Sequence, residues 1–241
     1  MKKSIFILLA LCLWITIPMN TYAMHIAEGA ISLNWCIFYF VLSTPFIFIS
    51  VKELKKVIKK NNEIKMLLGL MAAYIFMMSA MKLPSVTGSS SHPTGTGLGS
   101  IVFGPIVVVI LSVIVLLFQA LLLAHGGLTT LGANVLSMGV IGPFIAYGIY
   151  KLFKNKNKSL AVFLACALGN LSTYIVTSIQ LSLAYPDSVG GVMASAIKFM
   201  GVFALTQVPL AIVEGIISII LYDFIEKHCI KELNELEEAL L

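Results

Sequence analysis

The stretch HPTGTGLGSIVFGP, His92–Pro105, determines how many times this chain is predicted to cross the membrane. It follows the uncharged run Gly88–Ser91, and together the two runs interrupt a chain that is otherwise a series of apolar segments. Glycine permits backbone that other residues avoid, and proline cannot continue a helix that precedes it. We therefore predict that residues 92–103 form a short inward segment, that the chain turns at Gly104–Pro105, and that it returns as residues 106–124.

The composition of the whole chain indicates that most of it lies in a lipid bilayer. Hydrophobic residues make up 59% of the 241 residues, charged residues only 11%, and the mean hydropathy is +0.99. Soluble domains do not have this composition, so the chain is predicted to be an integral membrane protein in the lipid bilayer. Long unbroken apolar runs satisfy their backbone groups in lipid only as helices. These runs lie at about 33–51, 66–82, 98–124, 128–150, 159–185 and 192–222.

Lysines mark the connectors that should be cytoplasmic. Three clusters occur, namely Lys52, Lys55, Lys56, Lys59, Lys60 and Lys65; Lys151, Lys154, Lys156 and Lys158; and Lys227 and Lys231. The connectors 83–97, 125–130 and 185–191 carry Asp187 and should face outside. The formal charge of +5 thus has a topological explanation, and no nucleic-acid-binding patch is needed.

The lysine assignment requires an odd number of crossings between His92 and the connector at Lys151. The runs 98–124 and 128–150 supply only two crossings if each is one helix. A short inward segment over 92–103 supplies the third and leaves every lysine cluster inside. The prediction is an all-α bundle of about six to seven transmembrane helices, with the mature N-terminus outside and the C-terminus in the cytoplasm.

The first residues have the pattern of a signal peptide. Lys2 and Lys3 provide the positive start, Ile5–Pro18 is apolar but short for a bilayer span, and small residues surround Ala23. We predict cleavage after Ala23, which makes residues 1–23 a signal peptide and 24–241 a single transmembrane domain. An uncleaved anchor helix is the alternative, and it would remove the terminal amine from the chemistry below.

Cleavage would make His25 the second residue of the mature chain. The α-amine of Met24, the amide nitrogen of His25 and its imidazole can then close fused chelate rings around one divalent cation. Nitrogen-rich sites favour the later first-row metals. His92 is the predicted fourth ligand, because it lies in the uncharged segment before Pro93. A solvated loop histidine is the alternative for His92.

Four further residues were assigned supporting roles. Glu28 is predicted either to neutralise the cation or to hold the N-terminal segment in place. Ser91 and Thr94 are expected to orient an imidazole. His125 is expected at the outer rim, near enough to serve as an extra ligand or an entry residue, and a structural or supporting role is favoured.

Signatures of enzymes are missing from the sequence. It has no HExxH, no GxxxxGK[ST] and no GxSxG, so the chain is predicted not to be an enzyme and not to hydrolyse ATP itself. None of its four cysteines forms a CxxC pair, and Cys36 and Cys166, which lie inside apolar runs, are interpreted as small buried apolar side chains.

Three stretches resemble a known family: Met24–Gly29, Lys82–Gly99 and Leu122–Asn134. They are similar to the cobalt-specific CbiM component of energy-coupling-factor transporters. The likeness spans the mature chain and departs at Ala27 and Ser90, where the family often has Met and Cys. The resemblance implies capture of Co(II) from outside, for cobalamin synthesis, with the metal on Met24, His25 and His92. It also implies a membrane coupling subunit, ATPase subunits and a small accessory membrane protein as partners.

Other functions stay open at this point. The nickel-specific sister component has the same ligands, and four nitrogens in a plane suit Ni(II) at least as well as Co(II). A channel or secondary carrier acting alone should show repeat-related broken helices or a line of charged pore residues, and neither is evident. An intramembrane metalloenzyme would need a general base near the metal, for which Glu28 is the one nearby carboxylate.

Overall fold

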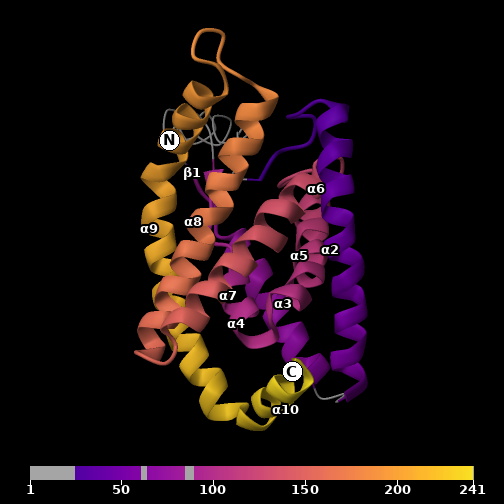
Figure 1. Cartoon of the computed structure of the whole chain (residues 1–241), viewed down its shortest axis with the longest axis vertical. Helices are drawn as coiled ribbons and strands as arrows, with labels where there is room; N and C mark the ends of the chain where they lie inside the picture. Colours follow the sequence, from indigo (N-terminus) through magenta and orange to yellow (C-terminus); the bar gives the residue numbers. More distant parts are fainter. Residues whose placement is uncertain (1–24, 61–63, 85–89, 241) are drawn as a thin grey trace, which may run out of the picture.

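The computed structural model describes residues 25–60, 64–84 and 90–240, and it confirms an all-helical bundle (Figure 1). The predicted signal peptide and Met24 lie outside these residues. The helices are α2 (Leu33–Lys60), α3 (Ile64–Ala80), α4 (Thr96–Phe103), α5 (Pro105–Leu122), α6 (Leu131–Asn134), the π-helix η2 (Val135–Ile141), α7 (Gly142–Phe153), α8 (Lys158–Ala184), α9 (Gly191–His228) and α10 (Ile230–Leu240). The two-residue strands β1 (Leu83–Pro84) and β2 (Ser90–Ser91) pair antiparallel.

Five of the described helical segments are long and apolar enough to cross a membrane. They are Leu33–Lys59, Pro105–Leu122, Leu131–Phe153, Lys158–Ala184 and Gly191–His228. Helix α3 is apolar but has 17 residues, and α4 has 8. The five long segments make the chain a multi-pass membrane protein.

The predicted break between α4 and α5 is present. Helix α4 ends at Phe103, Gly104 adopts φ 77° and ψ 152°, and α5 begins with Pro105 in its first turn. Glycine takes this positive φ without a Cβ clash, and proline at the start of a helix loses no hydrogen bond. The run 98–124 is therefore two helices that meet at a turn.

Helix α4 lies inside the bundle, and all eight of its residues are buried. Its glycines permit this depth because neighbouring helices approach the α4 backbone closely. A Cβ added to Gly97 would lie 2.8 Å from the Cα of Cys166 in α8. The short segment that begins at His92 is therefore enclosed by protein, as irregular backbone at membrane depth must be.

The run 128–150, expected as one helix, is more complex. It contains the single turn of α6, the π-helix η2 and then α7. π-Helical turns are rare and often occur at functional sites. Apolar periodicity does not distinguish i→i+5 from i→i+4 hydrogen bonding, so the π-helix could not be predicted from the sequence.

The small residues of α3 do not pack inside the bundle. Gly69 and Ala73 are exposed, and a Cβ added to Gly69 would meet no described atom within 4 Å. Within the described part of the chain, no other helix therefore packs closely against these two residues.

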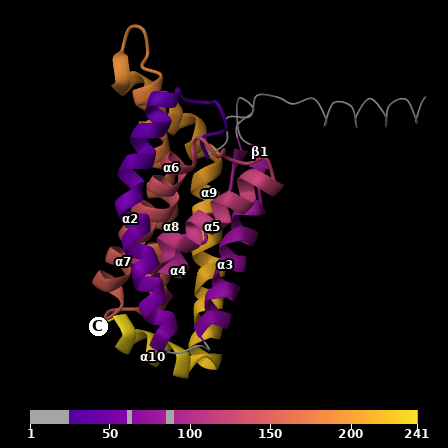
Figure 2. The same cartoon turned by 90° about the vertical axis from the view of Figure 1, so that its right-hand side faces the viewer.

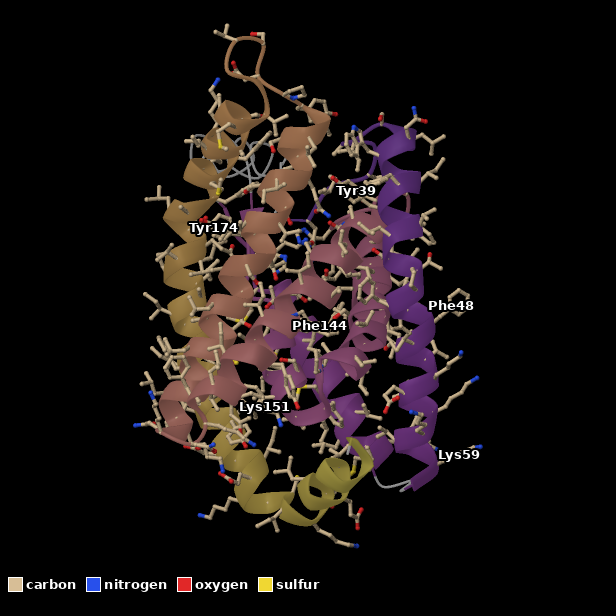
Figure 3. The ribbon with its side chains drawn as sticks, in the orientation of Figure 1. Tyr39, Phe48, Lys59, Phe144, Lys151 and Tyr174 are labelled. Carbon is tan, nitrogen blue, oxygen red and sulfur yellow. The ribbon has the colours of Figure 1, made fainter. Side chains whose placement is uncertain are left out.

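The lysine-rich connectors gather at one end of the bundle. Figure 3 labels Lys59 and Lys151 toward the same end, where α10 lies across the helices in Figures 1 and 2. The short strand β1 and α6 lie at the opposite end in both of those views. This agrees with the predicted sidedness, in which the lysine end is cytoplasmic.

Cysteine labelling in intact cells tests this sidedness. In a chain with its own cysteines replaced, Val189→Cys places a thiol in a connector where the side chain is 95% exposed. Asn155→Cys places one in the exposed lysine connector. We expect an impermeant maleimide to modify Val189→Cys in intact cells and Asn155→Cys only after permeabilisation. Labelling of Asn155→Cys in intact cells would overturn the topology.

Candidate metal centre

Three histidines from distant parts of the sequence meet at one place. His25 precedes α2, His92 lies between β2 and α4, and His125 lies between α5 and α6. Their exposed fractions are 0%, 0% and 3%. The ring centroids are 4.6 Å apart for His25 and His92, 4.8 Å for His25 and His125, and 4.9 Å for His92 and His125. One ligand nitrogen from each lies within 4.8 Å of the others.

The facing nitrogens have no hydrogen-bond partner among the described residues. These atoms are both ring nitrogens of His25 and the Nε2 atoms of His92 and His125. In His92, Nδ1 lies 2.8 Å from the carbonyl of Pro93. A carbonyl only accepts, so Nδ1 carries the proton and Nε2 keeps its lone pair. Buried polar atoms without partners are costly, and several at one place indicate a ligand.

Burial keeps these imidazoles neutral. His92 is fully buried, and removal from water disfavours the charged form of an imidazole. It also lowers the pKa values of His25 and His125, with smaller contributions from the charge of the neighbouring histidines and of Lys82. A neutral imidazole is the form that binds a metal, because protonation occupies the lone pair. At neutral pH the cluster therefore offers lone pairs to a cation.

The side chain of Asn134 holds the N-terminal segment. The amide of Ile26 donates to Asn134 Oδ1 at 2.8 Å, and Asn134 Nδ2 donates back to the carbonyl of Ile26 at 3.1 Å. The hydroxyl of Thr130 donates to the same carbonyl at 2.6 Å. Asn134 thus acts toward Ile26 as a strand partner would, and this fixes the residue next to His25. The sequence interpretation had favoured helix-to-helix bonding for Asn134.

Glu28 makes the second attachment of this segment. Its amide donates to the carbonyl of Gly126 at 3.2 Å, and its carboxylate accepts from the amide of Thr129 at 3.1 Å and from the Thr129 hydroxyl. These bonds from Thr129 lower the pKa of Glu28 and keep it ionised. A Cβ on Gly127 would lie 2.6 Å from the Cα of Glu28. Of the two roles predicted for Glu28, these contacts match the holding role.

A buried carboxylate holds the His92 segment from the other side. Glu214 of α9 accepts from the amides of Thr94 and Gly95 at 2.7 and 2.8 Å, and from the Thr94 hydroxyl at 3.1 Å. Asn170 of α8 also donates to Glu214. Gly95 has φ 70°, and a Cβ there would lie 3.1 Å from Ile75 Cα. Glycine is therefore required where the chain turns from His92 into α4.

Gln207 extends this network to His92 itself. Its Nε2 donates to the carbonyl of His92 at 3.1 Å and also to the side chain of Asn170. The position of His92 is thus set by polar side chains from the middle of two long helices. Asn170, Gln207 and Glu214 stand inside apolar runs of the sequence, where a polar side chain is costly, but the sequence does not show which groups they contact.

Three predicted roles need correction. Ser91 was expected to orient an imidazole, but its hydroxyl pairs with that of Thr206 at 2.7 Å. Thr94 was expected to do the same, and it pairs instead with Glu214. His125 was expected at the outer rim but is buried in the cluster, because the loop after α5 turns inward.

The donor set indicates which cations fit. The cluster contains only imidazoles, whereas calcium and magnesium prefer oxygen ligands. Neutral imidazole suits the late first-row divalent metals. Among the described residues no carboxylate belongs to this group, so a metal there would lack an adjacent general base.

Asn134→Ala tests the attachment of the N-terminal segment. Loss of Asn134 leaves the backbone of Ile26 with fewer partners, and a buried unsatisfied group costs about 1–3 kcal/mol. We expect a lower thermal midpoint and faster carbethoxylation of His25 by diethyl pyrocarbonate, read by mass spectrometry. Ser178→Ala is the matched control, because that hydroxyl bonds only the Tyr174 carbonyl of its own helix. Equal reactivity of His25 in both variants would contradict the attachment.

Comparison with known proteins shows related transporters. A solved structure described as a truncated transition metal transporter superposes with a TM-score of 0.74 at 26% sequence identity, covering 85% of this chain and 99% of that one. A second, described as a transition metal transporter, has a TM-score of 0.73 at 25% identity, covering 84% and 92%.

Sequence relatives are closer. The Cobalt transport protein CbiM of Clostridium tetani is 56% identical over 236 residues, which is 98% of each chain. That of Desulforamulus reducens is 53% identical over 219 residues, 91% of this chain and 88% of the relative. The family model for the cobalt uptake substrate-specific transmembrane region matches residues 25–230. On this evidence the chain belongs to the CbiM family of cobalt transport components.

Proposed function

We propose that this chain is the substrate-capture component of an energy-coupling-factor importer and binds Co(II) from outside through its mature N-terminus and His92. The observation that carries the proposal is the buried cluster of His25, His92 and His125, whose facing nitrogens lack partners among the described residues. The cobalt named in the relatives is the substrate that this donor set would accept.

The N-terminal amine is within reach of this cluster if the signal peptide is removed. Met24 precedes His25 directly, and successive Cα atoms are about 3.8 Å apart. The bonds of Asn134 and Thr130 to Ile26 hold the segment so that His25 lies beside His92. The amine, the His25 amide and the His25 imidazole would then provide three nitrogens, and His92 Nε2 the fourth.

His125 supports cobalt over nickel as the substrate. Four nitrogens in one plane are typical of Ni(II) and Cu(II). His125 brings an additional unpartnered nitrogen to the cluster, which would make a fifth nitrogen donor. A fifth nitrogen outside the plane would disfavour square-planar nickel. The nickel-specific component remains the second candidate.

The energy for import would come from partner proteins. The sequence has no nucleotide-binding motif of its own. The cluster of three histidines would bind a cation, but it has no group that would hydrolyse a nucleotide. We infer that a membrane coupling subunit, ATPase subunits and a small accessory membrane protein complete the importer. The cobalt delivered would serve cobalamin synthesis.

Replacement of single histidines tests the ligand set. We expect His25→Ala and His92→Ala to abolish retention of Co(II) by the purified protein in equilibrium dialysis. His125→Ala should keep binding but shift the preference toward Ni(II), because the off-plane nitrogen is lost. His228→Ala is the matched control, since that ring stacks on Phe224 at the opposite end of the chain. Full Co(II) retention by both His25→Ala and His92→Ala would remove the proposed site.

A four-residue insertion tests the terminal amine without removing any side chain. The residues Asn-Gln-Asn-Gln inserted between Ala23 and Met24 make histidine the sixth residue of the processed chain, so the terminal amine and the imidazole no longer share small fused chelate rings. Loss of an outer-shell partner costs about 10–100-fold in metal affinity, and loss of this ligand should cost at least as much. N-terminal sequencing confirms the processed end. Unchanged affinity with confirmed processing would exclude the amine as a ligand.

A further inference from the structure

A buried glutamine in the last turns of α5, Gln119, lies against the histidine cluster without belonging to it. Its exposed fraction is 0%, and its side-chain oxygen Oε1 has no hydrogen-bond partner among the described residues. Its backbone carbonyl accepts from the amide of His125 at 3.2 Å, where Ala124 turns the chain with φ 47°. A buried acceptor without a partner is costly, so this oxygen is expected to receive a hydrogen bond when the site binds its metal.

Ser79 of α3 determines which end of the Gln119 amide is the free end. The Ser79 hydroxyl donates to the carbonyl of Ile75 at 2.6 Å, and the carbonyl of Phe76 lies 3.0 Å away. A hydroxyl has one proton, so toward Gln119 it can only accept. The atom of Gln119 that bonds it is therefore Nε2. Oε1 is the other branch of the same amide, so it is the acceptor that remains available.

The group beside this oxygen is the ring of His25. Burial lowers the pKa of His25, and the charges of His92, His125 and Lys82 lower it further, whereas the side chain of Gln119 opposes them. An effect of this sign comes from a hydrogen-bond acceptor near the ring. Both ring nitrogens of His25 lack partners among the described residues. The oxygen and the ring therefore lie close together, and each can supply the partner that the other lacks.

The chelate gives the two ring nitrogens of His25 different tasks. In the proposed site the amide nitrogen and the imidazole of His25 bind the same ion, and only Nδ1 can close a six-membered ring with that amide nitrogen. The imidazole proton must then be on Nε2. Metal-bound histidines almost always donate this second N–H to a carboxylate, a carbonyl or a water. In His92 the nitrogens have the opposite tasks, since Nδ1 donates to the carbonyl of Pro93 and Nε2 keeps its lone pair.

We propose that Gln119 is a positioning residue of the metal site and that its Oε1 accepts the Nε2–H of His25. This bond holds the imidazole in the tautomer whose Nδ1 carries the lone pair, and it turns that lone pair toward the ion. The inference rests on the proposed function, because it takes Nδ1 as the metal-binding atom. Gln119 thereby supports two of the three histidines, His25 through its side chain and His125 through its backbone.

The tautomer of His25 in the metal-free protein tests this bond. The purified full chain is labelled with nitrogen-15 histidine, and long-range hydrogen–nitrogen couplings distinguish Nδ1–H from Nε2–H. The signals of His25 are those that His25→Ala lacks. We expect Nε2–H alone in the wild type and a mixture of both tautomers in Gln119→Leu, which has no acceptor. Gln119→Glu should restore Nε2–H, because a carboxylate also accepts.

Two further variants complete the test. Ser79→Ala leaves Gln119 in place but frees its amide to turn, so we expect a smaller shift of the His25 tautomer in the same direction. Gln180→Leu is the matched control for Gln119→Leu. Gln180 is also a buried glutamine with an unpartnered Oε1, but its Nε2 donates to the carbonyl of Ala133. It should keep the wild-type tautomer.

Cobalt affinity provides the second readout. A partner that orients a metal-bound histidine contributes about 10–100-fold to metal affinity. Gln119→Leu should therefore weaken Co(II) retention in equilibrium dialysis by a factor in this range, whereas Gln119→Glu and Gln180→Leu should retain Co(II) as the wild type does.

Two results would overturn the proposal. An unchanged His25 tautomer in both Gln119→Leu and Ser79→Ala would show that Gln119 does not hold the ring. Equal changes in Gln119→Leu and Gln180→Leu would show only the general effect of removing a buried amide. Failure of the proposed function has a different signature, in which the wild type retains no Co(II) while the metal-free tautomer still responds to Gln119→Leu. That result would contradict cobalt capture and uphold the contact between Gln119 and His25.

Discussion

The exchange of two hydrogen bonds between the side chain of Asn134 and the backbone of Ile26 is the constraint on which the site depends. A chain terminus ordinarily frays, because few contacts repay its ordering entropy. Here the buried side chain of Asn134, together with the hydroxyl of Thr130, forms the hydrogen bonds that a neighbouring strand would form with Ile26. These bonds hold the segment inside the bundle. Without this attachment His25 would not lie beside His92. The site thus consists of a segment that begins at His25, held by these bonds, and a pocket that receives it.

The pocket is fixed from the opposite side by Glu214. Its carboxylate collects the amides of Thr94 and Gly95, and Gln207 holds the carbonyl of His92. Polar groups inside a membrane are expensive and usually functional. In this chain the cost of burying Glu214 and Gln207 is reduced, because each forms hydrogen bonds with backbone groups between β2 and α4 that have no partner within a helix. Both halves of the histidine cluster are therefore positioned by side chains of the surrounding helices, and a shift of α9 would be transmitted to His92.

Much of this fold could be predicted from the sequence. The lysine clusters and the parity of the crossings required a short pass, and Gly104–Pro105 is the one place where its turn could form. His25 and His92 could be predicted as ligands of one metal. His25 would be the second residue after cleavage, and His92 lies in an uncharged segment between apolar runs. The burial of His125 could not be predicted, since it depends on how the loop after α5 folds inward. The hydrogen-bond partners of Asn134 and Glu214 could not be predicted either. A polar residue in an apolar run indicates that its burial is costly, but it does not show which group it contacts. The π-helical turn leaves no periodic signal.

The central claim is that nitrogen atoms of the chain end and of the buried histidines bind the transported cobalt. X-ray absorption spectroscopy of the cobalt-loaded, processed protein measures this ligand shell directly. The account predicts a shell of nitrogen donors with the multiple scattering of at least two imidazoles. A shell dominated by oxygen or sulfur, or one with no imidazole scattering, would contradict it.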